Sequence, residues 1–209
     1  MTHPIHEQHN TIFPEMMSHP ALFTHPHPKK VLIIDEDTSI LHEVIKHDHL
    51  AEVIFVSKTH SSIKNTNLKI HFYANDTTDW IKKVTPHSID IIIHASQTNH
   101  ELLKNFLTLL SSDGILIQQS TSLFEMATLK PLADQLRFAG FLDQQILNFP
   151  QPGFFSGWRS IIMATKQTNL KRIREKAIFT RSFKTYYYNL DTHKASLVLP
   201  EFARKEGVI

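Results

Sequence analysis

The 209-residue sequence contains no cysteine and only five glycines, the first of which is Gly114. The lack of cysteine excludes disulfides and thiolate metal sites, and it favours a cytoplasmic location. The lack of early glycine excludes a glycine-rich nucleoside loop from the first half of the chain, because such loops bring backbone N–H groups close to the ligand. Long apolar runs are also lacking: stretches such as 89–93 are far too short for a membrane span, so we expect no membrane contact.

The charges are nearly balanced. There are 22 Lys and Arg residues against 20 Asp and Glu, a net charge of +2 with neutral His, which does not favour a nucleic-acid partner. The 15 His residues are unusual in number, and His3, His6 and His9 recur in the polar N-terminal tail. This spacing is compatible with a borderline metal or with a plain polar tail. We favour the tail and predict no metal site.

Short apolar runs alternate with helical patterns along most of the chain. Helices are expected at 15–23, 38–47, 101–110 and 123–139, and strands at 31–34, 53–56, 69–73, 89–93 and 115–118. Two more strands, 143–149 and 159–164, flank a Pro/Gly-rich turn and read as an antiparallel pair. This alternation predicts an α/β fold with a doubly wound, mostly parallel Rossmann-like sheet of methyltransferase type. We place a His/Pro-rich N-terminal segment at 1–28 and this domain at 29–209.

Ligands of such sheets bind beyond the carboxyl ends of the parallel strands. The first of these ends, after Ile34, carries Asp35, Glu36 and Asp37. Three carboxylates in a row attract a cation such as a polyamine. They are equally typical of an acidic first turn of a helix, which the helix dipole favours.

The next strand ends carry weaker candidates. Ser57 stands where a nucleoside-binding site usually has an acid for the ribose hydroxyls. Asp76, followed by Thr77, can accept a hydrogen bond from an adenine amine or cap the next helix. His94 can act as a general base or can be a polar residue with an internal partner.

Several motifs together resemble the spermidine synthases, the polyamine aminopropyltransferases. The matching segments are 14–26, Leu41-His42-Glu43-Val44, 113–120, Ser156-Gly157-Trp158, 187–195 and Leu199-Pro200-Glu201-Phe202. The resemblance covers most of the chain from about Phe13 onward. It implies transfer of an aminopropyl group from decarboxylated S-adenosylmethionine, as co-substrate, to putrescine, which gives spermidine and methylthioadenosine. No other cofactor is implied, and the family's small N-terminal β domain is expected to be absent.

The resemblance also assigns positions. Asp37 falls on the family's acidic position for the amine, Ser57 on its ribose-binding acid, and Asp76 with Thr77 on its adenine contact. Ala95 takes the place of the catalytic Asp, with His94 beside it.

Two hypotheses follow. In the first, the protein is an enzyme of spermidine biosynthesis that uses Asp37, Asp76 and His94. In the second, it is a pseudoenzyme that binds a polyamine or nucleoside ligand, forms a homo-oligomer or binds a protein partner.

Overall fold

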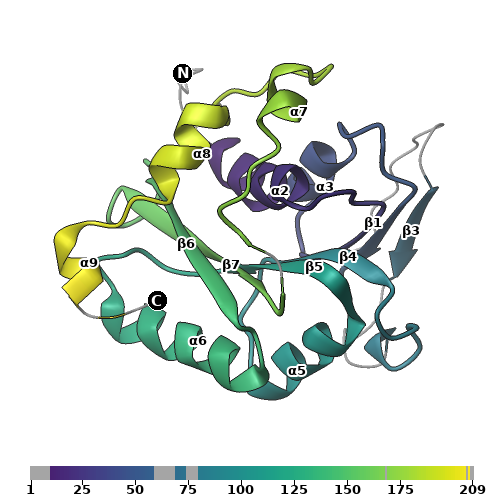
Figure 1. Ribbon diagram of the computed structural model, residues 1–209, viewed down its shortest axis with the longest axis horizontal. Helices are drawn as coiled ribbons and strands as arrows, with labels where there is room; N and C mark the ends of the chain where they lie inside the picture. The colour runs from purple at the N-terminus through teal and green to yellow at the C-terminus, as the bar shows by residue number, and fades with distance from the viewer. Residues whose placement is uncertain (1–9, 59–68, 74–79, 168, 206, 208–209) are drawn as a thin grey trace.

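A seven-stranded sheet forms the centre of the molecule (Figure 1). The computed structural model describes residues 10–58, 69–73, 80–167, 169–205 and 207. The strands are β1 (Lys30–Ile34), β2 (Glu52–Val56), β3 (Lys69–Tyr73), β4 (Ile89–His94), β5 (Leu110–Gln119), β6 (Asp143–Pro150) and β7 (Trp158–Thr165). Their order is β3-β2-β1-β4-β5-β7-β6, in which β1 to β5 pair in parallel and β7 pairs antiparallel with both β5 and β6. The predicted doubly wound sheet with its C-terminal antiparallel pair is confirmed.

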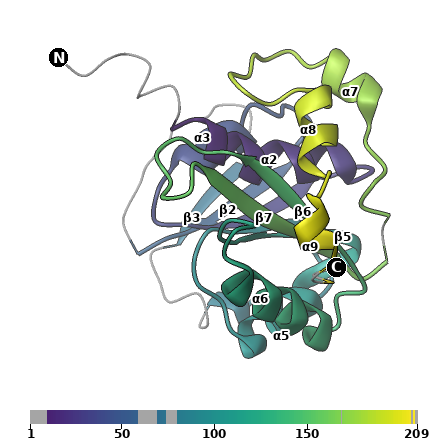
Figure 2. The ribbon, with the colours of Figure 1, turned by 90° about the vertical axis from the view of Figure 1, so that its left-hand side faces the viewer.

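Helices cover both faces of this sheet (Figures 1 and 2). They are α2 (Ile12–Thr24), α3 (Ser39–Val44), α5 (His100–Leu109), α6 (Met126–Ala139), α7 (Glu175–Phe179), α8 (Leu190–Ser196) and α9 (Glu201–Lys205). Helices α2 and α3 lie on one face, and α5 and α6 lie on the other. Among the described residues, no helix has the length and apolarity needed to cross a bilayer.

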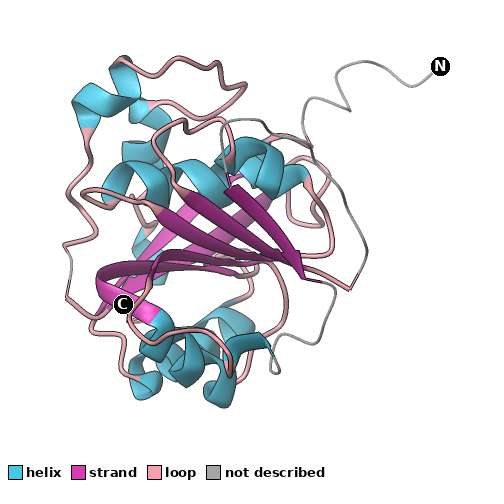
Figure 3. Ribbon diagram, turned by 90° about the vertical axis from the view of Figure 1, so that its right-hand side faces the viewer, coloured by secondary structure: helices cyan, strands magenta, loops and turns pink. Residues whose placement is uncertain are grey.

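The alternation of side chains along each strand builds two separate cores. Val31 and Ile33 of β1 are buried with α2 and α3, whereas Leu32 and Ile34 are buried with α5 and α6. This is the period of two that a strand imposes, and it explains why Val31 to Ile34 form a continuous apolar run. Figure 3 shows the sheet between these two helical layers.

Helix α2 belongs to the first of these cores. Met16, Met17 and Leu22 are fully buried there, and the helix packs against α3 and against strands β4, β5 and β7. It precedes the predicted boundary at residue 28, yet it covers the sheet as an integral part of the fold.

Three local predictions need correction. The strand expected at 115–118 is longer, because β5 already begins at Leu110, and its register against β4 shifts between Ile89 and Ile91. A Cβ on Gly114 would lie 2.8 Å from the Cβ of Leu110, so glycine is required by close approach. Helix α6 begins at Met126 rather than Leu123, although it ends at Gly140 as predicted, with φ at 114°. The basic stretch 171–184, for which the sequence analysis predicts no helix, contains α7.

Glu15 ties the C-terminal part of the chain to α2. Its buried carboxylate accepts hydrogen bonds from the backbone N–H groups of Tyr186 at 2.6 Å, Tyr187 at 2.9 Å and Tyr188 at 2.7 Å. These donors precede α8, whose first turn is closed by a capping box between Asn189 and Thr192. The carboxylate thereby satisfies three backbone donors that would otherwise lack partners.

We therefore expect Glu15→Gln to lower the free energy of unfolding by about 3 kcal/mol, since each hydrogen bond to a charged group contributes about 1.5 to 3 kcal/mol. Urea unfolding of the purified protein measures this loss. The matched control is Glu175→Gln, which breaks a half-exposed ion pair with Lys194 and should cost less than about 0.5 kcal/mol. Equal losses in the two variants would contradict the role assigned to Glu15.

Buried histidines make the stability depend on pH. His19, His47, His94 and His193 are each almost fully buried, and burial lowers the pKa of all four, that of His193 to about 4. The unfolded chain therefore binds more protons than the folded chain below about pH 6.5, the pKa of an exposed histidine. Burial raises the pKa of Asp35 to about 6, which opposes this trend but involves only one group.

Stability should accordingly be full above about pH 6.5 and fall as the pH is lowered towards 4. The urea midpoint, measured in steps from pH 7.5 to pH 4.5, reports this loss. His193→Gln should flatten the dependence, whereas the control His42→Gln should not, because His42 is exposed in the folded state. A midpoint that stays constant from pH 7 to pH 5 would refute the prediction.

Candidate ligand site at the strand ends

The carboxyl ends of the parallel strands line two adjoining cavities. The first, the β1–β4 cavity, has a volume of about 460 Å³ and lies at the ends of β1, β2 and β4, next to α5. The second, the β5 cavity, has a volume of about 570 Å³ and lies between the ends of β4 and β5, α6 and the turn before β7. Ser96 and Gln97 line both cavities. Their sizes are typical of small-molecule sites, and the sheet order reverses between β1 and β4, where such folds bind ligands.

Glu36 is the carboxylate that enters the β1–β4 cavity from the acidic run. It reaches from the end of β1 to the end of β2, where its Oε2 accepts hydrogen bonds from Ser57 Oγ at 3.2 Å and from the Lys58 N–H at 3.1 Å. Glu101 of α5 is the second carboxylate on this wall. A carboxylate is therefore present at the end of β2, although residue 57 itself is a serine.

His94 is held in one tautomer. The side chain of Gln118 donates through Nε2 to the carbonyls of Ser96 and Gln119, both at 3.0 Å, so its Oε1 must accept from His94 Nδ1 at 2.8 Å. Burial lowers the pKa of His94, so the ring is neutral, and Nε2 carries the lone pair. The ring also packs edge-on against Phe106 and lines the β1–β4 cavity.

Ala95 and His94 lie on opposite faces of the sheet. Ala95 packs against the core formed with α2, whereas His94 packs against Phe106 in the core formed with α5. Neighbouring residues along a strand point in opposite directions, so His94 does not replace a carboxylate at position 95.

The other predicted residues are placed differently. Asp37 accepts a hydrogen bond from the Ser39 N–H at 3.0 Å, at the start of α3, and Asp35 accepts one from the Glu36 N–H at 2.7 Å. Neither is among the side chains that line the two cavities. Asp76 and Thr77 lie outside the described residues. Within the described part of the chain, no group of three or more His, Asp or Glu side chains is arranged to hold a metal ion.

Arg159, the second residue of β7, brings a positive charge into the β5 cavity. Its Cζ lies 3.6 Å from the centroid of the Phe13 ring, and its Nη2 donates to Gln119 Oε1 at 2.7 Å. The guanidinium is partly buried and carries its charge at all ordinary pH values, although burial lowers its pKa. Glu125 of the same cavity accepts a hydrogen bond from the Thr121 hydroxyl.

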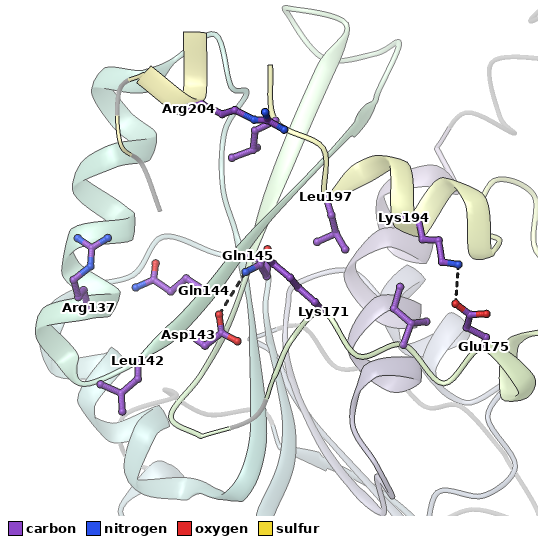
Figure 4. Close-up of a pocket in the computed structure, with 12 residues that line it drawn as sticks. Arg137, Leu142, Asp143, Gln144, Gln145, Lys171, Glu175, Lys194, Leu197 and Arg204 are labelled. Carbon is purple, nitrogen blue, oxygen red and sulfur yellow. Dashed lines mark hydrogen bonds and ion pairs between the residues drawn. The ribbon is translucent and has the colours of Figure 1, made fainter. Parts of the chain in front are cut away.

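A larger cavity of about 680 Å³ lies elsewhere, between α6, β6 and the C-terminal helices (Figure 4). Asp143 of this cavity stands opposite Thr165 of β7, which in turn pairs with Ile115, so this end of β6 lies away from the carboxyl end of β5. Three of the charged side chains there form ion pairs: Lys194 contacts Glu175 at 2.7 Å, and Arg137 contacts Asp134 at 2.6 Å. We therefore assign the candidate site to the strand ends.

Glu36 was predicted only as part of the acidic run, and Gln118 and Arg159 were not predicted as site residues. Gln118 lies near the end of β5 and follows the same strand-end rule as His94. Arg159 is the second residue of β7. Because β7 runs antiparallel to β5, it starts at the edge of the sheet where β5 ends.

Comparisons with known proteins agree with the fold. A family model described as "Spermine/spermidine synthase domain" matches residues 10–63. The polyamine aminopropyltransferase of Thioalkalivibrio sulfidiphilus is 34% identical over 96% of this chain and 79% of its own length. That of Nitrosococcus oceani is 34% identical over 94% of this chain and 76% of its own length.

Solved structures agree as well. The spermidine synthase of Thermotoga maritima superposes with a TM-score of 0.86 at 24% identity, over 96% of this chain and 75% of its own. A spermidine synthase in complex with the transition state analogue AdoDATO gives the same score at 23% identity. The extent and identity of the sequence matches show that this chain belongs to the polyamine aminopropyltransferase family.

Proposed function

We propose that this chain is a spermidine-synthase-like protein of polyamine metabolism that binds a nucleoside ligand in the β1–β4 cavity. The observation that carries the proposal is the carboxylate of Glu36 at the end of β2, held there by Ser57 and Lys58. A carboxylate at this place in a nucleotide-binding sheet accepts the ribose hydroxyls. The cytoplasm, where polyamines are made, is the location that fits a chain without cysteine.

The reaction implied by the family is transfer of an aminopropyl group from decarboxylated S-adenosylmethionine to putrescine. This site is poorly equipped for that reaction. Position 95 carries a methyl group, and His94 lies on the other face of the sheet. The amine-binding role of Asp37 stays a prediction: its carboxylate accepts a hydrogen bond from the Ser39 N–H and does not line either cavity. We therefore propose ligand binding with strongly reduced transfer, which makes the chain a pseudoenzyme of its family.

A polyamine bound at the acidic run 35–37 is the second candidate. The observation in its favour is the raised pKa of Asp35, about 6, which burial causes and the adjacent carboxylates reinforce. A cationic ligand would relieve this repulsion.

Calorimetry with methylthioadenosine tests nucleoside binding. Glu36→Gln should weaken binding about tenfold, because the loss of a hydrogen-bond acceptor with full charge costs about 1.5 kcal/mol or more. Glu52→Gln is the matched control. Glu52 is the first residue of β2, at the end of the strand away from the cavity, and it contacts Lys30 at 3.2 Å. Unchanged affinity in Glu36→Gln, or no binding by the unmodified protein, would refute the proposal.

An assay with decarboxylated S-adenosylmethionine and putrescine tests transfer. We expect methylthioadenosine to form at least 100-fold more slowly than with the Nitrosococcus oceani relative assayed in parallel, because a general base contributes about 10² to 10⁴ in rate. Turnover comparable to that of the relative, and lost in Asp37→Asn, would show an active transferase.

A further inference from the structure

Arg159 gives the β5 cavity a charge that does not suit an amine. Its guanidinium is held from two sides, by the ring of Phe13 and by the side chain of Gln119. These contacts fix its plane, because an aromatic face and a single acceptor together leave little freedom of rotation. A cationic aminopropyl or diamine chain in this cavity would meet a fixed like charge, which disfavours binding.

One donor of the same guanidinium lacks a partner. Its Nε is buried and, among the described residues, forms no hydrogen bond. The hydroxyl of Thr98, also on the cavity wall, is buried without a partner in the described structure. Buried donors of this kind are unfavourable unless a ligand or water pairs with them. An arginine fork with open donors is the usual partner of a carboxylate.

The other side chains that line the β5 cavity suit an ammonium group placed next to such a carboxylate. Glu125 is the carboxylate of this cavity, and most of the other lining side chains are uncharged amides and hydroxyls. One cation and one anion in a neutral polar cavity complement a zwitterion, whereas a diamine requires two anions.

The two cavities share Ser96 and Gln97 in their walls, so groups bound in them would lie side by side. We propose that the β5 cavity binds the α-amino-acid group of an adenosyl amino acid, with its carboxylate on Arg159 and its ammonium group facing Glu125. The site would thus prefer a carboxylated nucleoside over the decarboxylated donor that the family resemblance implies. This inference rests on nucleoside binding in the β1–β4 cavity.

Calorimetry with three uncharged-sulfur nucleosides separates the two proposals. Methylthioadenosine probes the β1–β4 cavity alone, S-adenosylhomocysteine adds the amino-acid group, and its decarboxylated form adds only the amine. We expect S-adenosylhomocysteine to bind at least tenfold more tightly than the decarboxylated form. Arg159→Gln should abolish this preference and leave methylthioadenosine binding unchanged, and Arg159→Lys should keep part of it, because the charge remains but the planar fork is lost.

Arg137→Gln is the matched control, since Arg137 is an exposed arginine of α6 that does not line the β5 cavity. If methylthioadenosine binds but the decarboxylated form binds as tightly as S-adenosylhomocysteine, the inference fails and the nucleoside site stands. If none of the three nucleosides binds, both proposals fail. If Arg159→Gln does not fold, the affinities of the unmodified protein for S-adenosylhomocysteine and for its decarboxylated form still test the inference.

Discussion

The carboxylate of Glu15 is the interaction on which the first helical layer depends. It joins residue 15 to three consecutive N–H groups more than 170 residues later, and so holds the segment before α8 against α2. Helix α2, which carries Phe13, in turn covers the face of the sheet on which Ala95 lies. Arg174 adds a second charged contact to the same helix, because it donates to the carbonyl of Leu22 at 2.6 Å. The ring of Phe13 lies 3.6 Å from Cζ of Arg159, so α2 also forms part of the surroundings of that guanidinium.

The sheet then determines which side chains can meet. At its carboxyl edge, Glu36 crosses from β1 to β2, whereas Gln118 crosses from β5 towards β4 and holds His94. Each of these side chains forms at least one hydrogen bond within the protein, which orients it before any ligand arrives. The alternation of the strand, however, separates His94 from Ala95. Proximity in sequence therefore does not compensate for a carboxylate lost at position 95.

Much of the fold could be predicted from the sequence, because buried parallel strands contain continuous apolar runs such as 31–34 and 91–93. The C-terminal helices could not be predicted in the same way, since the stretch 171–184 is polar and its packing depends on distant contacts with α2, such as the hydrogen bonds from Arg174 to the carbonyls of Leu22 and Phe23. Within the site, the strand-end rule found His94 and the acidic run. It did not show that the carboxylate of Glu36 would lie at the end of β2, because its contact with Lys58 depends on the pairing of β1 with β2. Arg159 was missed because the rule concerns parallel strands.

Family membership and site chemistry rest on different residues in this protein. The apolar residues of the two cores and the pairing of the strands maintain the aminopropyltransferase fold, and they do not depend on the charge of the ligand. The charge of the ligand is determined by a few side chains at the carboxyl edge. There, Glu36 and Glu101 face one cavity, while Arg159 and Glu125 face its neighbour. A change from aminopropyl transfer to the binding of a zwitterionic nucleoside therefore requires few substitutions, and none of them disturbs the core.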